Sequence, residues 1–229
     1  LTIVSPSVWL KAEAQSSELF KNRIIQVIPY GLNTKLFTIR NPKFGRELFN
    51  IPSHKKVILF VADSIQNNRK GYIYLKRALE NLNSSDVILC SLGKGAPKFD
   101  SHLEMMHLGH INDDRFLSVV YSLADVFVIP SLMDNLPNTV LESLLCGTPV
   151  IGFPIGGIRD MISQGNNGIL TSEVSVNSLQ NTIEIFLFQK VKWSKEKIRE
   201  QAVLNYDQSV QAKKYIDLYT EIINASNYS

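Results

Sequence analysis

Two adjacent cations, Arg69 and Lys70, stand in a long connection at 63–71, between an apolar β-rich run and the start of a stretch with helical spacing. The free backbone N–H groups at a helix start, together with such cations, attract phosphate. The pair therefore favours a phosphate-binding site. A solvent-exposed basic pair without a ligand is the plainer alternative.

Two carboxylates, Asp134 and Glu142, are eight residues apart in a stretch where a loop passes into a helix. Pro137 suits the first turn of that helix, which we expect to run to Cys146. Eight residues at helical rise span at most about 12 Å. That distance suits the two hydroxyl-rich ends of a nucleotide sugar, with the helix N-terminus facing the diphosphate. Two acids at this spacing are also common without any shared role.

Other patterns are less specific. Gly93 begins Gly-Lys-Gly after a strand, where glycine lets a ligand approach the backbone, but a plain turn reads the same way. His107 and His110 have no third or fourth ligand nearby, so we predict no metal site. The absence of a Gly-x-Ser-x-Gly pattern argues against a serine hydrolase.

The elements that must position these residues alternate along the chain. We expect strands at 57–62, 87–92, 106–108, 126–130, 149–153 and 168–171, and helices at 71–82, 114–124, 137–146, 158–162, 176–191, 195–206 and 208–225. This order predicts an α/β fold with a Rossmann-like, doubly wound and mostly parallel sheet. Ligands of such sheets bind beyond the carboxyl ends of the strands, where the loops named above lie.

Composition narrows the function classes. The 229 residues are 45% hydrophobic, and 24 basic against 21 acidic residues give a net charge of +3. This charge is too small to demand a nucleic-acid partner. The basic stretch 190–200 is either a solvated helix face or a weak contact with anionic lipid. Cys90 and Cys146 suit buried thiols of a reducing compartment, so we expect a cytoplasmic protein, with the inner face of the cell membrane as the place of any lipid contact.

Taken in order, the motifs resemble the C-terminal half of glycosyltransferase family 4 over nearly the whole chain. The segments that carry the resemblance are 27–37, 108–111, 121–131, 142–151 and the pair Gly156-Gly157. That family has the GT-B fold, in which two Rossmann-like domains enclose a cleft. Its members are retaining enzymes with nucleotide-sugar donors. The resemblance implies no metal cofactor, with the nucleotide sugar as a substrate.

The resemblance also implies roles for individual residues. Lys70 corresponds to the lysine that binds the donor diphosphate, and Asp134 to the first acid of Glu-x7-Glu, which binds donor sugar hydroxyls. Glu142 corresponds to the second acid, which holds the ribose. The remaining positions are the phosphate-facing amides of Asn138 and Thr139, and Gly93 and Ile111 beside the nucleobase.

The sequence departs from the family at three places. Ala62-Asp63 replaces the usual Gly-Arg, so Arg69 is our candidate for the missing cation. Asn135, Leu136 and a proline replace Gly-Phe-Gly, and the proline removes one amide donor. Asp134 is one methylene shorter than the usual Glu.

The resemblance implies a division of the chain and a function. We expect 1–30 to be the end of an N-terminal domain and a linker, 31–207 the donor-binding domain, and 208–229 a helix that crosses to the N-terminal domain. The implied activity is transfer, with retention, to a sugar or lipid-linked acceptor in bacterial surface polysaccharide assembly. Without the rest of an N-terminal domain, this chain is expected to bind donor and be inactive alone. A non-catalytic nucleotide-sugar-binding module, or a GT-B epimerase or phosphorylase, is the alternative.

Overall fold

The computed structural model describes residues 1–80, 82, 84–95, 103–188 and 193–227. Within these residues, six parallel strands form the main sheet in the order β5-β4-β3-β6-β7-β8. The strands are β3 (Lys56–Ser64), β4 (Val87–Lys94), β5 (Glu104–His107), β6 (Val126–Ile129), β7 (Val150–Gly152) and β8 (Gly168–Leu170). The chain leaves β3 toward one edge and β6 toward the other, which is the Rossmann order. The predicted α/β, Rossmann-like fold is confirmed.

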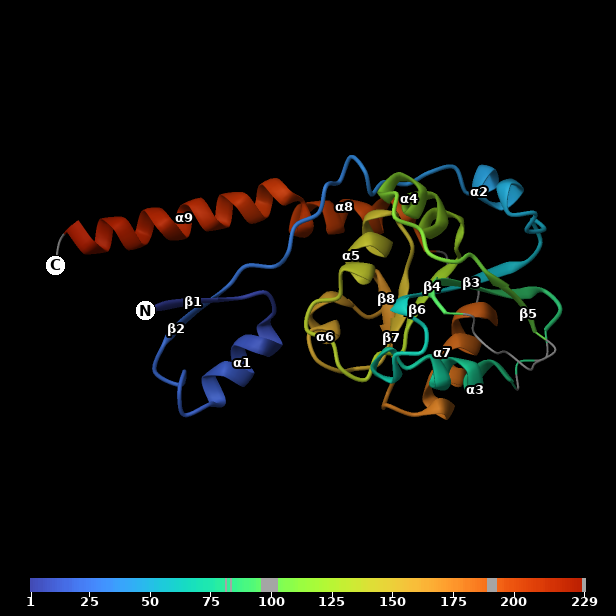
Figure 1. Cartoon of the computed structure of the whole chain (residues 1–229), viewed down its shortest axis with the longest axis horizontal. Helices are drawn as coiled ribbons and strands as arrows, with labels where there is room; N and C mark the ends of the chain where they lie inside the picture. Colours follow the sequence, from blue (N-terminus) through green and yellow to red (C-terminus); the bar gives the residue numbers. More distant parts are fainter. Residues whose placement is uncertain (81, 83, 96–102, 189–192, 228–229) are drawn as a thin grey trace.

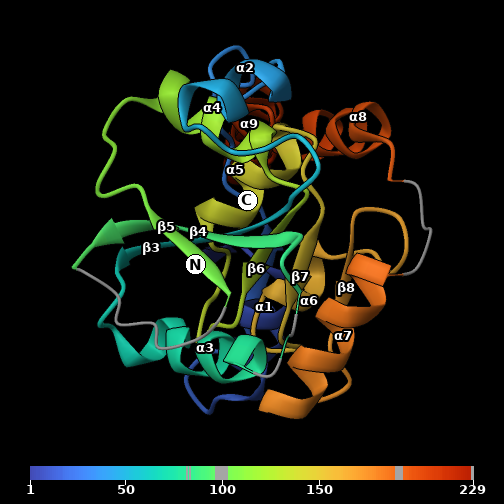
Figure 2. The same cartoon turned by 90° about the vertical axis from the view of Figure 1, so that its right-hand side faces the viewer.

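Helices cover both faces of this sheet (Figure 2). One face carries α2 (Pro42–Leu48), α4 (Asp114–Leu123), α5 (Asn138–Leu145) and α8 (Lys195–Tyr206), and the other carries α3 (Tyr72–Glu80) and α7 (Val176–Phe188). The short helix α6 (Ile158–Met161) follows β7. Successive residues of β3 enter opposite apolar clusters, Leu59 under the first group and Ile58 under the second. Burial on both faces explains why the strand is apolar throughout.

Several element boundaries differ from the predictions. Arg69 and Lys70 do not begin a helix but lie in the 3₁₀ turn η1 (Asn68–Lys70), and Gly71 in the left-handed conformation separates them from α3. The strand expected at 106–108 runs from Glu104 to His107 because it pairs with β4 in register from Glu104. The predicted end of α7 at 191 lies outside the described residues.

The first 30 residues form a small unit apart from the main sheet (Figure 1). Strands β1 (Thr2–Ser5) and β2 (Ile24–Val27) pair in parallel, with α1 (Val8–Ser16) between them in sequence. Helices α1 and α2 and strand β2 were not predicted. Helix α1 has no buried residue, so its sequence carries no apolar stripe to detect.

The long helix α9 (Gln208–Asn227) projects from the body on the same side as β1 and β2 (Figure 1). On this helix the Leu218 side chain is buried, whereas Ile222 is 39% exposed. At its base the amide of Leu32 donates to Tyr206 O, and the amide of Gln208 donates to Leu32 O. Leu32, just after the predicted linker and within the predicted donor-binding domain, therefore crosses the joint between α8 and α9. The domain boundaries at 30 and 207 stay predictions.

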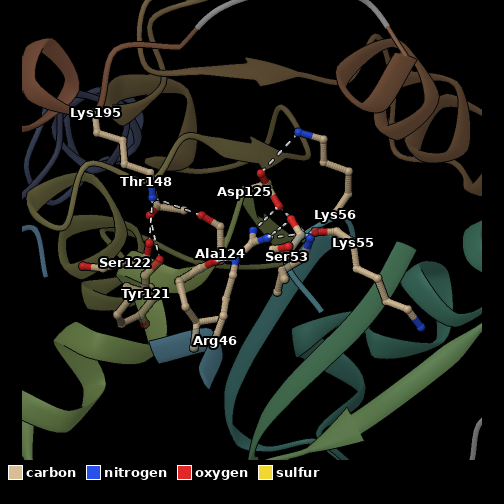
Figure 3. Close-up of polar contacts among 12 residues, drawn as sticks. Arg46, Ser53, Lys55, Lys56, Tyr121, Ser122, Ala124, Asp125, Thr148 and Lys195 are labelled. Atoms are coloured by element: carbon tan, nitrogen blue, oxygen red, sulfur yellow. Dashed lines mark hydrogen bonds and ion pairs between the residues drawn. The ribbon is translucent and has the colours of Figure 1, made fainter. Parts of the chain in front are cut away.

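A polar network fastens the amino ends of the central strands (Figure 3). Asp125, just before β6, accepts hydrogen bonds from the Arg46 guanidinium at 2.8 Å and from the Val57 amide of β3 at 2.7 Å. Arg46 of α2 also donates to Leu123 O. One carboxylate thus joins two adjacent strands to a covering helix.

The same region uses cations that we had placed on a solvated or lipid-facing surface. Lys195 Nζ donates to the carbonyls of Ser122 and Ala124 (Figure 3), and burial lowers its pKa. Arg199 donates to the carbonyls of Phe37 and Thr34, among others. These two basic residues of the stretch 190–200 are therefore structural, and 190–192 lie outside the described residues. None of the helices in the described part combines the length and apolar content that a membrane crossing requires.

We predict that Asp125→Ala lowers the free energy of unfolding by about 2–3 kcal/mol, in the range for hydrogen bonds to charged groups. The side chain is 23% exposed, so the loss stays below that of a fully buried ion pair. Urea unfolding with an unchanged m-value measures it. Asp217→Ala removes an exposed ion pair on α9 and is the matched control, with an expected change within about 0.5 kcal/mol. Equal effects of the two substitutions would contradict the assigned role.

Candidate functional site

The loops that follow β3 and β6 contact each other where the strand order reverses. The amide of Leu132 donates to Arg69 O at 2.8 Å. Gly71, at φ +69°, lies so close to β6 that a Cβ there would stand 1.8 Å from the carbonyl oxygen of Pro130. Only glycine permits this approach. The contact holds the cationic turn against the loop that carries the predicted acid.

Lys70 and Asp134 form an ion pair across this contact. Lys70 Nζ lies 3.1 and 3.2 Å from the two carboxylate oxygens of Asp134. The side chains are 18% and 13% exposed. Because little water screens the pair, its attraction exceeds that of an exposed pair. The structure thus brings together our two candidate catalytic residues, to which the resemblance assigns the donor diphosphate and the donor sugar hydroxyls.

A cavity of about 320 Å³ opens beside this pair, at the carboxyl ends of β3 and β6. Helix α5 starts there at Asn138, with Pro137 as N-cap rather than inside the helix as predicted. Proline has no side-chain group that could cap the first-turn amides, so this positive helix end stays open to an anion. The described residues that line the cavity are Tyr30, Val61, Ala62, Asp63, Arg69, Lys70, Asp134, Leu136, Pro137, Asn138 and Thr139.

Two glycines after β7 support the loop that carries Asp134. The amide of Gly157 donates to Asp134 O at 3.2 Å. A Cβ at Gly157 would stand 1.5 Å from Asn135 O, and one at Gly156 would stand 1.9 Å from Asp134 O. The pair Gly156-Gly157, which the sequence showed only as part of a family motif, has a physical reason here: it lets two loops pack backbone to backbone.

Asn135 faces the N-terminal segment. Ser7, the N-cap of α1, donates its hydroxyl to Asn135 Oδ1, and the Trp9 amide donates to the Asp160 carboxylate at 2.9 Å. A second cavity of about 360 Å³ lies here, lined by Trp9, Tyr30, Arg69, Met133, Asp134, Asn135 and Leu136. Sequence reasoning missed both aromatic residues. Trp9 lies outside the recognised motifs, and Tyr30 lies in the segment 27–37, to which we assigned no ligand role.

Glu142 lies on α5, to one side of the two cavities. Its Oε2 accepts a hydrogen bond from the buried Tyr121 hydroxyl at 2.7 Å. Burial raises the pKa of the Glu142 carboxyl, and the bond from Tyr121 opposes that rise. The amide of Gly93 donates to Gly109 O at 2.7 Å near β5, and Ile111 packs on the core nearby.

The structure therefore gathers part of the predicted site. Arg69, Lys70, Asp134, Leu136, Asn138 and Thr139 line the first cavity, and Asn135 lines the second. Glu142, Gly93 and Ile111 are not among the described residues that line either cavity, and their ligand roles stay predictions. The described residues contain no group of three or more His, Cys, Asp or Glu side chains placed to hold a metal ion.

A doubly wound sheet with a cavity at its switch point defines a Rossmann-type domain. The chain belongs to the glycosyltransferase family described as Glycosyl transferases group 1, whose model matches residues 55–187. It is 32% identical to D-inositol 3-phosphate glycosyltransferase of Corynebacterium diphtheriae, over 64% of this chain and 38% of the relative. It is 25% identical to N,N'-diacetylbacillosaminyl-diphospho-undecaprenol alpha-1,3-N-acetylgalactosaminyltransferase of Campylobacter jejuni, over 90% of this chain and 56% of the relative.

Solved structures show the same fold. Sucrose-phosphate synthase from Thermosynechococcus elongatus aligns with 98% of this chain and 59% of its own, at a TM-score of 0.85 and 24% identity. Anabaena HepE in complex with UDP-glucose aligns with 96% of this chain and 64% of its own, at a TM-score of 0.77 and 18% identity. The chain thus spans less than two thirds of these relatives and neighbours.

We predict that Gly157→Ala displaces the loop at 134–135, because the added methyl group meets backbone that cannot turn aside. The cost is about 1–3 kcal/mol of unfolding free energy, as for overpacking. Hydrogen–deuterium exchange should become faster in a peptide covering 131–140. Gly165→Ala is the control: Gly165 has φ +77° and no atom near its Cβ position, so it loses stability without altering that peptide. Unchanged exchange in Gly157→Ala would refute the supporting role.

A second prediction concerns Glu142. Because burial raises the pKa of its carboxyl in the folded state, ionisation costs stability at pH values above that raised pKa. Glu142→Gln should therefore be at least as stable as the wild type at pH 7–8. This advantage should shrink as the pH falls and disappear below the unfolded-state pKa of about 4.3.

Equilibrium unfolding between pH 4 and pH 8 measures the difference. The control is Glu18→Gln, a side chain 91% exposed, for which we expect a difference within about 0.5 kcal/mol at every pH. A Glu142→Gln variant that is less stable than wild type by the same amount at all pH values would show that the carboxylate is a needed acceptor for Tyr121.

Proposed function

We propose that the protein is a retaining glycosyltransferase, which moves a sugar from a nucleoside diphosphate sugar to a saccharide or lipid-linked acceptor. The observation that carries this proposal is the pairing of Lys70 with Asp134 at the switch point, inside a cavity that also receives the open N-terminus of α5. This arrangement offers positive groups for a diphosphate and, next to them, a carboxylate for sugar hydroxyls.

Each group has a distinct part in the reaction. When the bond between the sugar C1 and the diphosphate oxygen breaks, negative charge grows on the leaving group. Lys70, Arg69 and the first-turn amides of α5 stabilise that charge, and such preorganised donors are usually the largest catalytic contribution. Asp134 accepts hydrogen bonds from hydroxyls of the transferred sugar and so orients it.

Arg69 has a specific reason to take part. Asp63 lines the same cavity where the resembled family has an arginine, so the cavity wall holds a carboxylate that repels a diphosphate. Arg69 lines both cavities and is exposed to an incoming ligand. It supplies the charge that Asp63 removes.

Glu142 binds the ribose in this proposal, and Tyr121 keeps its carboxylate in one orientation through their hydrogen bond. The backbone near Gly93 and Ile111 lies beside the nucleobase. A nucleotide sugar would thus run from the ends of β4 and β5, across the start of α5, to Asp134. No metal ion is needed in this scheme, because protein cations meet the diphosphate charge.

The acceptor hydroxyl attacks C1 from the side on which the diphosphate leaves, so the configuration is retained. Its proton passes to the departing diphosphate oxygen, which balances the step. The name of the Campylobacter relative includes an undecaprenol diphosphate acceptor, which supports a lipid-linked acceptor here. We place the reaction in surface polysaccharide assembly, in the cytoplasm at the inner face of the membrane.

A non-catalytic nucleotide-sugar-binding module is the second candidate. The observation in its favour is the carboxylate of Asp63 in the cavity, where it weakens the positive field that catalysis needs. Such a module would bind the nucleotide sugar without turnover, whereas the enzyme would release the nucleoside diphosphate.

We predict that, in the full-length enzyme, Lys70→Ala lowers kcat by a factor of about 10²–10³ at saturating donor, by analogy with the removal of one preorganised donor. The substitution also leaves the half-buried Asp134 unpaired, at a cost of about 1–3 kcal/mol in stability. Activity is therefore measured at a temperature where thermal unfolding shows both proteins folded. Lys43→Ala, on the distant helix α2, is the control and should keep wild-type turnover.

Arg69→Ala separates the two cations. If Arg69→Ala loses turnover while Lys70→Ala keeps it, Arg69 carries the phosphate and our assignment of Lys70 is wrong. If the full-length wild-type protein binds nucleotide sugar but shows no turnover with any saccharide or lipid-linked acceptor, the module is correct. If neither single variant nor the double variant changes turnover of an active protein, the cavity is not the phosphate site.

A further inference from the structure

The second cavity adjoins the first. Of the described residues, Tyr30, Arg69, Asp134 and Leu136 line both cavities. The first cavity contains the Lys70 side chain and the start of α5. The second extends from Asp134 toward the N-terminal segment. A ligand held by its diphosphate in the first cavity therefore meets the second cavity at the side of Asp134.

Large apolar and aromatic side chains line the second cavity beside its polar groups. Trp9 is half-buried, Tyr30 is 43% exposed and Met133 is 63% exposed. Among the described aromatic contacts, neither the Trp9 ring nor the Tyr30 ring stacks on another aromatic ring. Large apolar groups left open beside a polar site commonly mark a surface that binds a ligand.

The first turn of α1 is fixed on two sides, which places Trp9. The Ser7 hydroxyl accepts from the Leu10 amide and donates to Asn135 Oδ1. The Trp9 amide donates to the Asp160 carboxylate at 2.9 Å, at the end of the domain where α6 lies. The backbone that carries Trp9 is therefore bound to the loop that carries Asp134 and Asn135. These hydrogen bonds fix the two sides of the second cavity relative to each other.

The chemistry of the lining selects one class of ligand. The face of an aromatic ring carries partial negative charge and attracts polarised C–H groups. Asp134, Asn135 and Arg69 offer hydrogen-bond acceptors and donors around it. A pyranose ring presents a C–H face and a rim of hydroxyl groups, and so matches both features. A purely apolar ligand would shield Asp134, Asn135 and Arg69 from water without offering them a hydrogen bond.

We propose that the second cavity is a saccharide subsite, in which a pyranose ring packs against Trp9 and Tyr30 while its hydroxyls reach Asp134 and Asn135. This inference rests on the proposed function and extends it to residues of the N-terminal segment. The sugar is either the one attached to the donor or the one that terminates the acceptor, since both must meet beside Asp134 for transfer.

The test compares Trp9→Ala with wild type by calorimetric titration. The probes are UDP, GDP and ADP, each beside its glucose conjugate, together with UDP-N-acetylglucosamine and GDP-mannose. Phe44→Ala, which removes an aromatic side chain 55% exposed on α2, is the matched control. A second assay uses a Trp193→Phe background, in which Trp9 is the sole tryptophan of a chain that has two. Quenching of its fluorescence then reports methyl glycosides binding beside a saturating nucleoside diphosphate.

We expect Trp9→Ala to leave the affinity for the nucleoside diphosphate unchanged. If the subsite holds the donor sugar, affinity for the nucleotide sugar falls at least fivefold. If it holds the acceptor sugar, donor affinity is unchanged and a methyl glycoside quenches Trp9 in the Trp193→Phe protein. Either result supports the subsite, and Phe44→Ala should change neither.

Two results overturn the inference. One is a Trp9→Ala protein that binds every nucleotide sugar as wild type does, with no glycoside quenching Trp9. The other is an equal loss of affinity for nucleoside diphosphate and nucleotide sugar, because that would make Trp9 a support of the phosphate site. Failure of the proposed function looks different: wild-type protein would then bind none of the nucleoside diphosphates or nucleotide sugars.

Discussion

The backbone contact between the loop after β3 and the loop after β6 is the constraint on which the site depends. Gly71 lies against the carbonyl of Pro130, and the Leu132 amide bonds to Arg69 O. These two loops belong to adjacent parallel strands from which the chain departs in opposite directions, so they diverge unless something joins them. Because they are joined, a lysine from one and a carboxylate from the other share one cavity.

The two ends of the sheet are held by different means. At the amino end, Asp125 and Arg46 bind backbone groups and each other, and Lys195 donates to buried carbonyls. At the carboxyl end, glycines permit backbone contacts and leave the charged side chains paired but partly open. Polar groups thus serve stability at one end, while at the other they remain available to a ligand.

Much of the fold and part of the site could be predicted from the sequence. The apolar runs and their alternation with amphipathic helices fix the parallel sheet, and sheet topology then brings Lys70 near Asp134. The N-terminal unit could not be predicted this way, because α1 buries no residue and β1 and β2 are short. Trp9 was missed because its position depends on the hydrogen bonds from Ser7 and to Asp160, which join segments far apart in sequence.

In the ion pair between Lys70 and Asp134, each side chain neutralises the charge of the other. Under the proposed function, the donor must divide this pair, with the diphosphate taking the lysine and the sugar hydroxyls taking the carboxylate. A free phosphate would pair with Lys70 and leave the Asp134 carboxylate without a partner. A free sugar would pair with Asp134 and leave Lys70 without a partner. Each half-ligand is therefore penalised by the group that it leaves behind, and a molecule carrying both halves escapes that penalty. Under the proposed function, the ion pair therefore favours binding of the intact nucleotide sugar over binding of free phosphate or free sugar.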